Sequence, residues 1–570
     1  MPELSSTTQP PHSSDATQNT RHGVRFWGIF VSLCLLAFIS ALGVSIISTA
    51  LPTITAEIGG ATQYVWIANS FVIASSILQP LFGQLADIFG RQPPLVVCVA
   101  VFILGSGIGG GAHNVALLIT GRTIQGIGAG GVYVLIDIVC CDLVPLRDRG
   151  KYLGLMFSWA GLAAALGPPV GGALAQANWR WVLWINIPIC GVALGALLAF
   201  MRVGKRGEHS KRTMTSRLKQ IDYLGTAIFI PSIFAVLYRL IMGGVIHPWS
   251  SWRIIVPLVL GVLGWIAFHI QQHLFASHAS MPSRLFSNRT SATAFLLTFL
   301  SSVLIQSVTY FLPIYFQGVL NTTVLESGTY FLPYAIGSLF AAVLGGGLLS
   351  KLGAYRPLHA GAFAISAVSF GFFTLLNSGT SRVAWAFFQL ISALGTGITM
   401  SIMLPAIMAG LPESDVASSS ATYSFIRNFG LIWGITVPGI MFNAAVDNNL
   451  HLVDNPTLRG VLRGGGAYAF ASQAHGLRGT FDAAVWHQVT EVYTRALRAI
   501  WWFGLSISIV SLFAVAGERG LELRKDLETE YGLEEKEPEK GEVEQEAVDQ
   551  REEKHGQTAI DSEVKITAAS

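Results

Sequence analysis

The sequence contains about fourteen apolar runs, each long enough to cross the hydrocarbon core of a membrane as one helix of roughly 19 residues. The runs begin near Trp27, Val65, Pro94, Val115, Tyr152, Trp181, Tyr223, Ile254, Ala292, Thr329, Leu358, Val383, Ala417 and Ala499. Only 12% of the residues are charged, against about a quarter in ordinary soluble proteins. A chain of this kind is expected to fold as an all-α polytopic membrane protein.

Lysine and arginine residues indicate how the chain is oriented in the membrane. If the N-terminus is cytoplasmic, the loops on that side carry most of the basic residues, above all the segment 202–219, while the short outer loops carry about one each. An even number of spans then places both termini in the cytoplasm. We expect the polar ends, residues 1–25 and 518–570, to be disordered, because they contain too little apolar surface to fold.

The apolar runs divide into two groups of six, separated by a pair. The predicted domains are an N-terminal six-helix bundle (26–202), a basic cytoplasmic loop (203–221), two inserted helices (222–273) and a C-terminal six-helix bundle (274–517) that contains a long extracellular loop (446–496). A weak repeat supports this division, because the glycine spacing of Gly83–Arg91 recurs in Gly346–Arg356, where Ser350 stands in place of the aspartate. Paired bundles with a site at their interface are typical of secondary transporters.

Asp137 is the only acidic residue inside one of the long apolar runs. A carboxylate in hydrocarbon costs at least ~2.5–3.5 kcal/mol, so a residue of this kind has a function by default unless a partner satisfies it. We predict that Asp137 takes up a proton on one side of the membrane and releases it on the other. The alternative is a permanent hydrogen-bond network with the neighbouring helices.

Arg122 is a charged residue in the same run. It precedes Asp137 by roughly 22 Å along a helix, so the two side chains cannot pair directly. A guanidinium does not lose its charge, and at this depth it should find carboxylates, carbonyl groups or water. An arginine that only holds neighbouring helices together through carbonyl bonds is the alternative to a part in transport.

Four motifs together resemble the major facilitator superfamily, in particular its fourteen-span drug:proton antiporters with their fungal toxin and multidrug pumps. Gly83–Arg91 is similar to the loop signature, Gly121–Gly128 to the fourth-span signature, Leu166–Gly172 to the antiporter signature, and Asn178–Pro188 to the entrance of the sixth span. The resemblance extends from about Phe26 to Gly517. It implies the major facilitator fold, alternating access and proton-driven export.

The resemblance also implies roles for particular residues. The conformational latch would comprise Gly83, Asp87, Gly90, Arg91 and Asp142, with Arg91 paired to Asp142, although a static structural staple would use the same residues. Arg122 would take part in proton coupling. The antiporter motif comprises Gly167, Pro168, Pro169, Gly171 and Gly172; its prolines lack amide donors and should bend the fifth span, and a simple kink is the alternative.

One position departs from the family pattern. Most fourteen-span relatives carry an aspartate in the first span, and Gly43 stands at that place here. The role of that acid is therefore not transferred to this chain. Asp137 is the one candidate to replace it.

Several polar and aromatic residues are candidates for the lining of a substrate cavity. They are Gln125, Tyr310, Tyr315, Gln317, Tyr334 and Asn428. A cavity with so few charges would suit hydrophobic compounds that are uncharged or weakly cationic. Asn321 begins a glycosylation sequon on a predicted outer loop.

The sequence therefore predicts a proton-coupled exporter of hydrophobic small molecules, such as drugs or fungal secondary metabolites, in the plasma membrane. It contains no phosphate-binding G-x-x-x-x-G-K-[ST] loop and no paired carboxylates or histidine cluster in the spans, which argues against an ATP-driven pump and an enzyme. We expect no metal and no cofactor beyond the proton-motive force, no nucleic-acid partner, and a monomer surrounded by lipid. The alternatives are a vacuolar, siderophore or amino-acid transporter of the same family, and a transport-inactive sensor.

Overall fold

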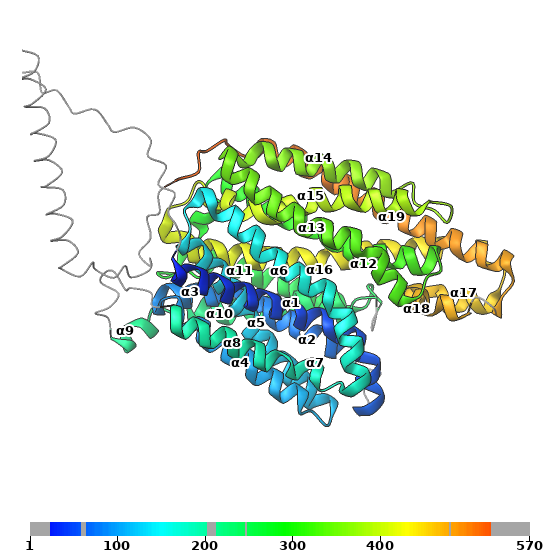
Figure 1. Ribbon diagram of the computed structural model, residues 1–570, viewed down its shortest axis with the longest axis horizontal. Coiled ribbons are helices and arrows are strands. Elements are labelled where there is room, and N and C mark those ends of the chain that lie inside the picture. Colours follow the sequence, from blue (N-terminus) through cyan, green and yellow to red (C-terminus); the bar gives the residue numbers. More distant parts are fainter. Residues whose placement is uncertain (1–22, 59–63, 202–212, 245–247, 478–479, 526–570) are drawn as a thin grey trace, which may run out of the picture.

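The computed structural model describes residues 23–58, 64–201, 213–244, 248–477 and 480–525. Two helical bundles lie side by side in it, with a further helix pair packed against both (Figure 1). The predicted all-α fold of two bundles with two inserted helices is confirmed.

The first bundle contains the helices before residue 202. They are α1 (Val24–Ile58), α2 (Tyr64–Ile77), α3 (Gln79–Phe89), α4 (Gln92–Gly110), α5 (Val115–Leu143), α6 (Leu146–Asn178), the short α7 (Trp181–Trp184) and α8 (Asn186–Phe200). A short helix, α9 (Met214–Leu218), leads to the inserted pair α10 (Tyr223–Met242) and α11 (Trp252–Leu274).

The second bundle follows the inserted pair. It contains α12 (Arg289–Ile314) with a π-helical turn η4 (Tyr315–Val319), α13 (Val324–Leu352), α14 (Tyr355–Phe373), α15 (Arg382–Met408), the 3₁₀ turn η5 (Glu413–Asp415), α16 (Val416–Asn449), the short α17 (Pro456–Leu462) and α18 (Gly466–Leu477), α19 (Ala483–Ala514) and the 3₁₀ turn η9 (Val515–Gly517).

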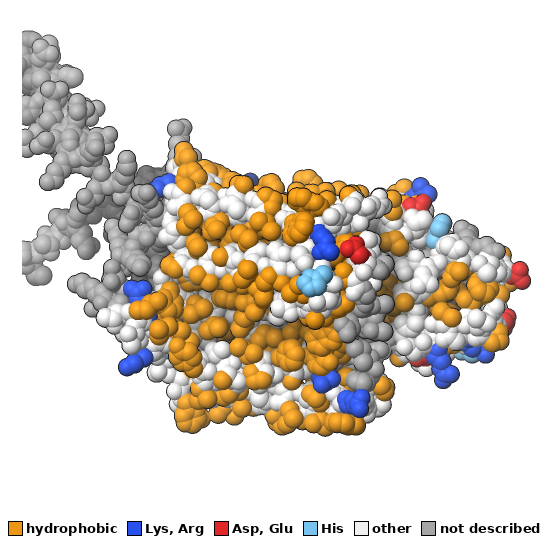
Figure 2. Space-filling model, turned by 90° about the horizontal axis from the view of Figure 1, so that it is seen from below, with side chains coloured by type: hydrophobic (Ala, Val, Ile, Leu, Met, Phe, Trp, Pro, Cys, Tyr) orange, Lys and Arg blue, Asp and Glu red, His pale blue; other side chains and the backbone are white. Residues whose placement is uncertain are grey.

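Among the described residues, eleven helices are long and apolar enough to cross a membrane, and up to thirteen spans result if two bent helix pairs each count as one. One bend, of 43°, separates α2 from α3, where Pro80 opens the second helix. α14 is not among these spans, but it takes the place of the predicted eleventh and packs against α15 and α19. The predicted count of about fourteen is thus approximate. Apolar side chains cover much of the face shown in Figure 2, with charged side chains at its two ends and a small group of charged and histidine side chains near its middle.

Aromatic contacts fix the inserted pair to both bundles. The ring of Trp66 in α2 stacks on Tyr238 of α10 at 4.8 Å, and Phe229 of α10 packs against Phe425 of α16 at 5.1 Å. The Asp222 carboxylate caps α10 by accepting from the Gly225 amide at 2.8 Å. The pair is therefore packed into the protein rather than attached by its loops alone.

The two ends of the bundles differ, and they are named here by what they carry. The tail end carries the turn at Gly90 and the segment Glu518–Lys525, while the opposite cap end carries α17 and α18 (Figure 1). The sequence analysis assigns the tail end to the cytoplasm.

The predicted extracellular loop 446–496 is largely helical where the structure describes it. α16 continues to Asn449, α17 and α18 follow, and α19 begins at Ala483 rather than near Ala499. Phe470 of α18 stacks on Trp486 of α19 at 6.2 Å, which gives these helices an apolar interface outside the spans. A hydropathy window detects the length of an apolar run, and it misses helical turns that continue into polar sequence.

The start of the predicted disordered tail is also ordered. Glu518 is 2% exposed and its carboxylate lies 2.8 Å from Nδ1 of His359 in α14. Leu523 is buried as well. Composition predicted disorder here because it does not reveal that partners for these side chains exist in the second bundle. Residues 526–570, 1–22 and most of the basic loop at 203–221 lie outside the described residues.

Candidate functional site

Asp137 lies at the interface of the two bundles, between α5 and α16. Its side chain is 1% exposed, and Oδ2 accepts a hydrogen bond of 3.2 Å from the hydroxyl of Ser424, which belongs to the second bundle. Oδ1 has no hydrogen-bond partner among the described residues. The acid therefore faces protein rather than lipid, and half of its acceptor capacity is left for a proton or a water molecule.

Arg427 supplies positive charge on the opposite side of this interface. It follows Ser424 by one helical turn in α16 and acts electrostatically on Asp137. Its guanidinium carbon lies 4.9 Å from the ring centroid of Phe157 in α6 and 5.5 Å from that of Tyr423. The arginine thus reaches from the second bundle to the first. The sequence analysis missed Arg427, although an arginine inside an apolar run is the same signal that identified Asp137 and Arg122.

Tyr133 lies in α5 between Arg122 and Asp137. It precedes Asp137 by one turn, and its phenol is within electrostatic range of both Arg427 and Arg122. It is partly exposed, whereas α5 is buried from Val134 to Asp142.

Arg122 makes its hydrogen bonds within the first bundle. Its Nη1 donates to the Gly43 carbonyl at 3.0 Å and to Oε1 of Gln125 at 2.7 Å, and the guanidinium lies 4.5 Å from the ring centroid of Phe71. The side chain is 1% exposed, yet Nε and Nη2 have no partner among the described residues. Gln125 is thus a partner of Arg122, and Gly43, which stands where the resemblance leads us to expect an aspartate, presents a carbonyl oxygen to the guanidinium.

The loop motif forms the predicted ion pair. Nε of Arg91 lies 2.7 Å from Oδ2 of Asp142, and Nη1 lies 2.9 Å from Oδ1 of Asp87. Gly90 has a φ of +86°, a conformation that favours glycine. Both ion pairs lie within the first bundle and do not themselves cross the interface.

Two residues of the same motif do face the second bundle. A Cβ atom on Gly83 would lie 2.4 Å from Cβ of Ala421 in α16, so the helices approach each other closely there. Asp87 lies within electrostatic range of Asp415 and Arg284, near the start of α16. Gly83 therefore permits close contact between a helix of the first bundle and α16, and Asp87 brings a negative charge near the second bundle.

Further contacts join the bundles at the tail end. Nη2 of Arg149, a side chain with 0% exposure, lies 2.7 Å from Oε2 of Glu413, and Nε of Arg147 donates to the Ser350 carbonyl at 2.8 Å. The Ser350 hydroxyl in turn donates to Asp148. Sequence analysis treated these arginines only as loop charges, since nothing in the sequence reveals their partners. The protein is closed at its tail end in this conformation.

The antiporter motif lies at a break in α6. The two parts of the helix meet at an angle of 47° between Gly167 and Pro169, which agrees with the predicted proline bend at Pro168-Pro169. Gly167 is tightly packed, because a Cβ atom there would lie 1.7 Å from Oγ of Ser45 in α1. Gly171 is buried and Gly172 has open space around its Cβ position.

The other candidate cavity residues are dispersed. Tyr315 donates to the Asn377 carbonyl at 2.9 Å, Gln317 to Ser327 at 3.1 Å, Tyr310 stacks on Tyr468 at 5.0 Å, and the Tyr334 hydroxyl lies 3.2 Å from that of Thr396. Tyr315 and Gln317 belong to η4 at the cap end and take part in packing there. Asn428 is half-buried next to Arg427, so it is the candidate closest in sequence to the charged interface.

The predicted glycosylation residue, Asn321, lies at the cap end. It is half-buried with a φ of 54°, and its carbonyl accepts from Nδ1 of His475 in α18 at 2.8 Å. The sequon is thus on the side that the orientation argument assigns to the exterior.

Comparisons with known proteins agree with this architecture. A family model described as Major Facilitator Superfamily matches residues 33–435. The MFS efflux transporter aclA of Aspergillus oryzae is 43% identical over 530 residues, which cover 92% of this chain and 94% of that protein. The MFS-type efflux pump LUC4 of a Fusarium species is 41% identical over 540 residues, covering 94% and 95%.

The fold is also found in a solved structure. The human organic anion transporter MFSD10 (TETRAN) superposes with a TM-score of 0.54 at 13% identity, covering 87% of this chain and 100% of that one. At this identity the likeness concerns the fold alone. The match of the family model and of full-length relatives at about 40% identity shows that the chain belongs to the major facilitator superfamily and is a membrane transporter, not an enzyme.

Proposed function

We propose that this transporter exports hydrophobic small molecules, such as fungal secondary metabolites, in exchange for protons that bind to Asp137. The observation that carries the proposal is the placement of Asp137 at the bundle interface, where Ser424 donates to one carboxylate oxygen and no described residue bonds to the other. The relatives named efflux pumps support the direction of transport. The plasma membrane, with the tail end in the cytoplasm, is the proposed location.

Proton exchange follows from the charges at this interface. When Asp137 is ionised, it attracts Arg427 and accepts from Ser424, both in the other bundle, and this favours the closed tail end. A proton that arrives from the cap end neutralises the carboxylate and weakens that attraction. The bundles can then separate at the tail end, release the proton there and admit the next cargo molecule.

The proton gradient supplies enough free energy for this cycle. One proton that moves inward across ~100 mV releases ~2.3 kcal/mol, and each pH unit adds ~1.4 kcal/mol. With two pH units the total is about 5 kcal/mol, which corresponds to a cargo gradient of roughly 10³–10⁴.

The composition of the interface favours apolar cargo. The side chains around Asp137 and Arg427 include the rings of Phe157, Tyr423 and Tyr133, which offer large contact areas with few hydrogen-bonding groups. We further propose that the Arg91–Asp142 pair acts as a conformational latch and that the bend at Pro168-Pro169 takes part in antiport. Asn321 carries a glycan, and the protein is a monomer.

The test is dye loss from cells that express the protein, with a panel of lipophilic compounds headed by the uncharged dye Nile red. Wild-type protein should accelerate loss, and a protonophore should abolish the acceleration. Asp137→Asn should reduce it to the level of cells without the protein at equal surface expression. Asp454→Asn, which removes an acid of the cap that bonds to Gln488, is the matched control and should transport normally.

Two results would overturn the proposal. Undiminished, protonophore-sensitive loss with Asp137→Asn would remove the acid from the mechanism. Equal retention of every compound by cells with and without the protein would favour a transport-inactive sensor.

A further inference from the structure

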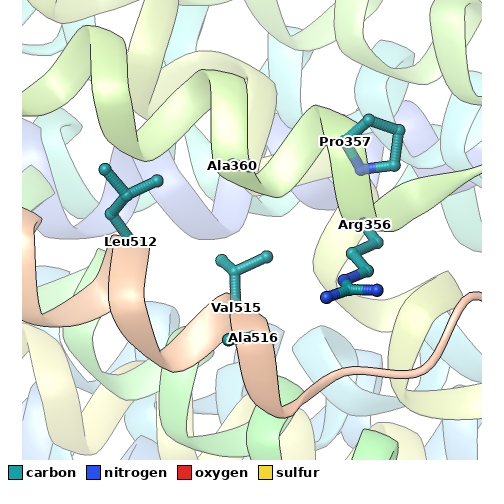
Figure 3. A pocket seen from close by; sticks show the side chains of 6 residues that line it. All are labelled: Arg356, Pro357, Ala360, Leu512, Val515 and Ala516. Carbon is teal, nitrogen blue, oxygen red and sulfur yellow. The ribbon is translucent and has the colours of Figure 1, made fainter.

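An apolar groove runs between α14 and α19 at the tail end of the second bundle. Its volume is about 350 Å³, and its walls are formed by Arg356, Pro357, Ala360, Leu512, Val515 and Ala516 (Figure 3). Five of these six side chains are apolar. Arg356 extends from the first turn of α14 towards η9, at one end of the groove (Figure 3).

Positive charge gathers at this end of the groove. Arg356 is exposed and forms no ion pair with an acid among the described residues. Arg289, at the start of α12, donates through Nη2 to the carbonyl of Ala516 at 3.4 Å, so a second guanidinium lies beside the same wall. The one acid of the adjoining segment that is buried, Glu518, is directed to His359 instead. Within the part of the chain that the structure describes, neither guanidinium at the mouth of the groove forms an ion pair with an acid.

The groove lies at the ends of two long helices, where the headgroups of a surrounding bilayer would meet the protein. α14 begins at Tyr355 and α19 ends at Ala514, so both helices reach their ends there. Phe513, next to the groove wall, is 75% exposed, as expected for a side chain that faces acyl chains. A site of this shape and place is covered by lipid in a membrane, and guanidinium groups at the end of a span attract anionic headgroups.

We propose that this groove is a binding site for an anionic phospholipid. The phosphate group lies between Arg356 and Arg289, and one acyl chain lies along Ala360, Leu512 and Val515. Arg356 is suited to this role because a guanidinium donates two parallel hydrogen bonds to phosphate oxygens. A zwitterionic lipid would fill the same apolar space and offer the same phosphate, but its headgroup cation offsets that charge, so its net attraction to the two guanidinium groups is weaker.

The test is lipid binding by the full-length protein, purified and delipidated in detergent. Phosphatidylserine and phosphatidylcholine are added separately, and native mass spectrometry counts the lipids that remain bound. We expect one phosphatidylserine to be retained in preference to phosphatidylcholine. Arg356→Gln should weaken that binding about fivefold, since each basic residue near the surface contributes ~1 kcal/mol to the attraction.

Two further variants separate the site from general surface charge. Lys351→Gln removes an exposed basic residue at the same end but outside the groove, and it should retain the lipid. Ala360→Trp fills the groove without changing its charge and should lose the lipid. Equal binding of both lipids, equal losses with Arg356→Gln and Lys351→Gln, or a dimer in place of the lipid adduct would each overturn the proposal.

Discussion

At the scale of single residues, the arrangement of Asp137 and Arg427 explains why charges occur at this depth. Each would be costly alone in a low-dielectric interior, and the attraction between them acts across the interface of the two bundles. Arg122 differs, because its Gly43 and Gln125 partners move with the same bundle. The stability of the Asp137–Arg427 pair is therefore linked to the conformation of the whole transporter.

Substitutions of Arg427 should change the pH dependence of transport. Arg427→Gln removes the positive charge, so the carboxylate of Asp137 loses its main electrostatic support and holds its proton to higher pH. The pH profile of dye efflux should move to more alkaline values, with a loss of transport of roughly tenfold or more at neutral pH. Arg427→Lys keeps the charge and should restore the profile. If both variants lose activity with an unchanged profile, Arg427 only packs against Phe157 and Tyr423.

The residue-scale predictions relied on charges that interrupt an apolar run. Asp137 and Arg122 were identified in this way, and the Arg91–Asp142 contact followed from a motif. Arg427 satisfied the same rule and was overlooked. Ser424 and Glu413 could not be identified from the sequence at all, because only the three-dimensional arrangement shows which hydroxyl and which carboxylate lie opposite a charge.

At the scale of helices, glycine determines how closely the two bundles approach. A Cβ atom on Gly346 of α13 would lie 2.1 Å from the Gly150 carbonyl of α6, and one on Gly154 would lie 2.5 Å from the Ala342 carbonyl. These contacts are between backbones, so the neighbouring atoms cannot move aside. The tail end can close fully only because these positions lack side chains.

Gly346→Ala should therefore disfavour the closed tail end while leaving each bundle intact. The added methyl group has no room, and such overpacking costs about 1–3 kcal/mol, enough to shift the equilibrium towards the open form about tenfold or more. Maleimide labelling of Ser401→Cys, which is buried at this contact, measures the change. The adjacent Gly347 has nothing within 4 Å of its Cβ position, so Gly347→Ala should label slowly, as the parent does. Equal rates for the two glycine variants would contradict the argument.

The predicted positions of the helices depended on hydropathy, and the helices that were missed are those that hydropathy cannot detect. Hydropathy located the spans, including the pair α10 and α11 between the bundles. It did not reveal α17 and α18 or the early start of α19, because these turns are helical but polar. The bend in α6 was predictable, since consecutive prolines remove backbone donors whatever the surroundings.

At the scale of the whole molecule, the segment Glu518–Lys525 contacts both bundles. It is fixed to the second bundle by the Glu518–His359 pair and by Nη2 of Arg524, which lies 3.2 Å from Oε1 of Glu413. The same glutamate binds Arg149 of the first bundle. In addition, the Arg147 amide donates to the Arg524 carbonyl at 3.1 Å. The segment therefore holds both bundles at the tail end, and its order arises from partners that its composition does not indicate.

Removal of this segment should favour the open tail end. Truncation after Gly517 deletes the contacts of Arg524 with both bundles; if each hydrogen bond contributes a net 0.5–1.5 kcal/mol, the equilibrium should shift by about tenfold. The five cysteines are buried, so spin labels on Lys151→Cys and Lys351→Cys can report the separation of α6 and α13 directly. Truncation after Lys525 is the matched control, because it removes residues 526–570 and keeps every contact described above. A longer mean distance in the first truncation alone would show that these eight residues stabilise closure, whereas a change of equal size in both would assign the effect to the distal chain.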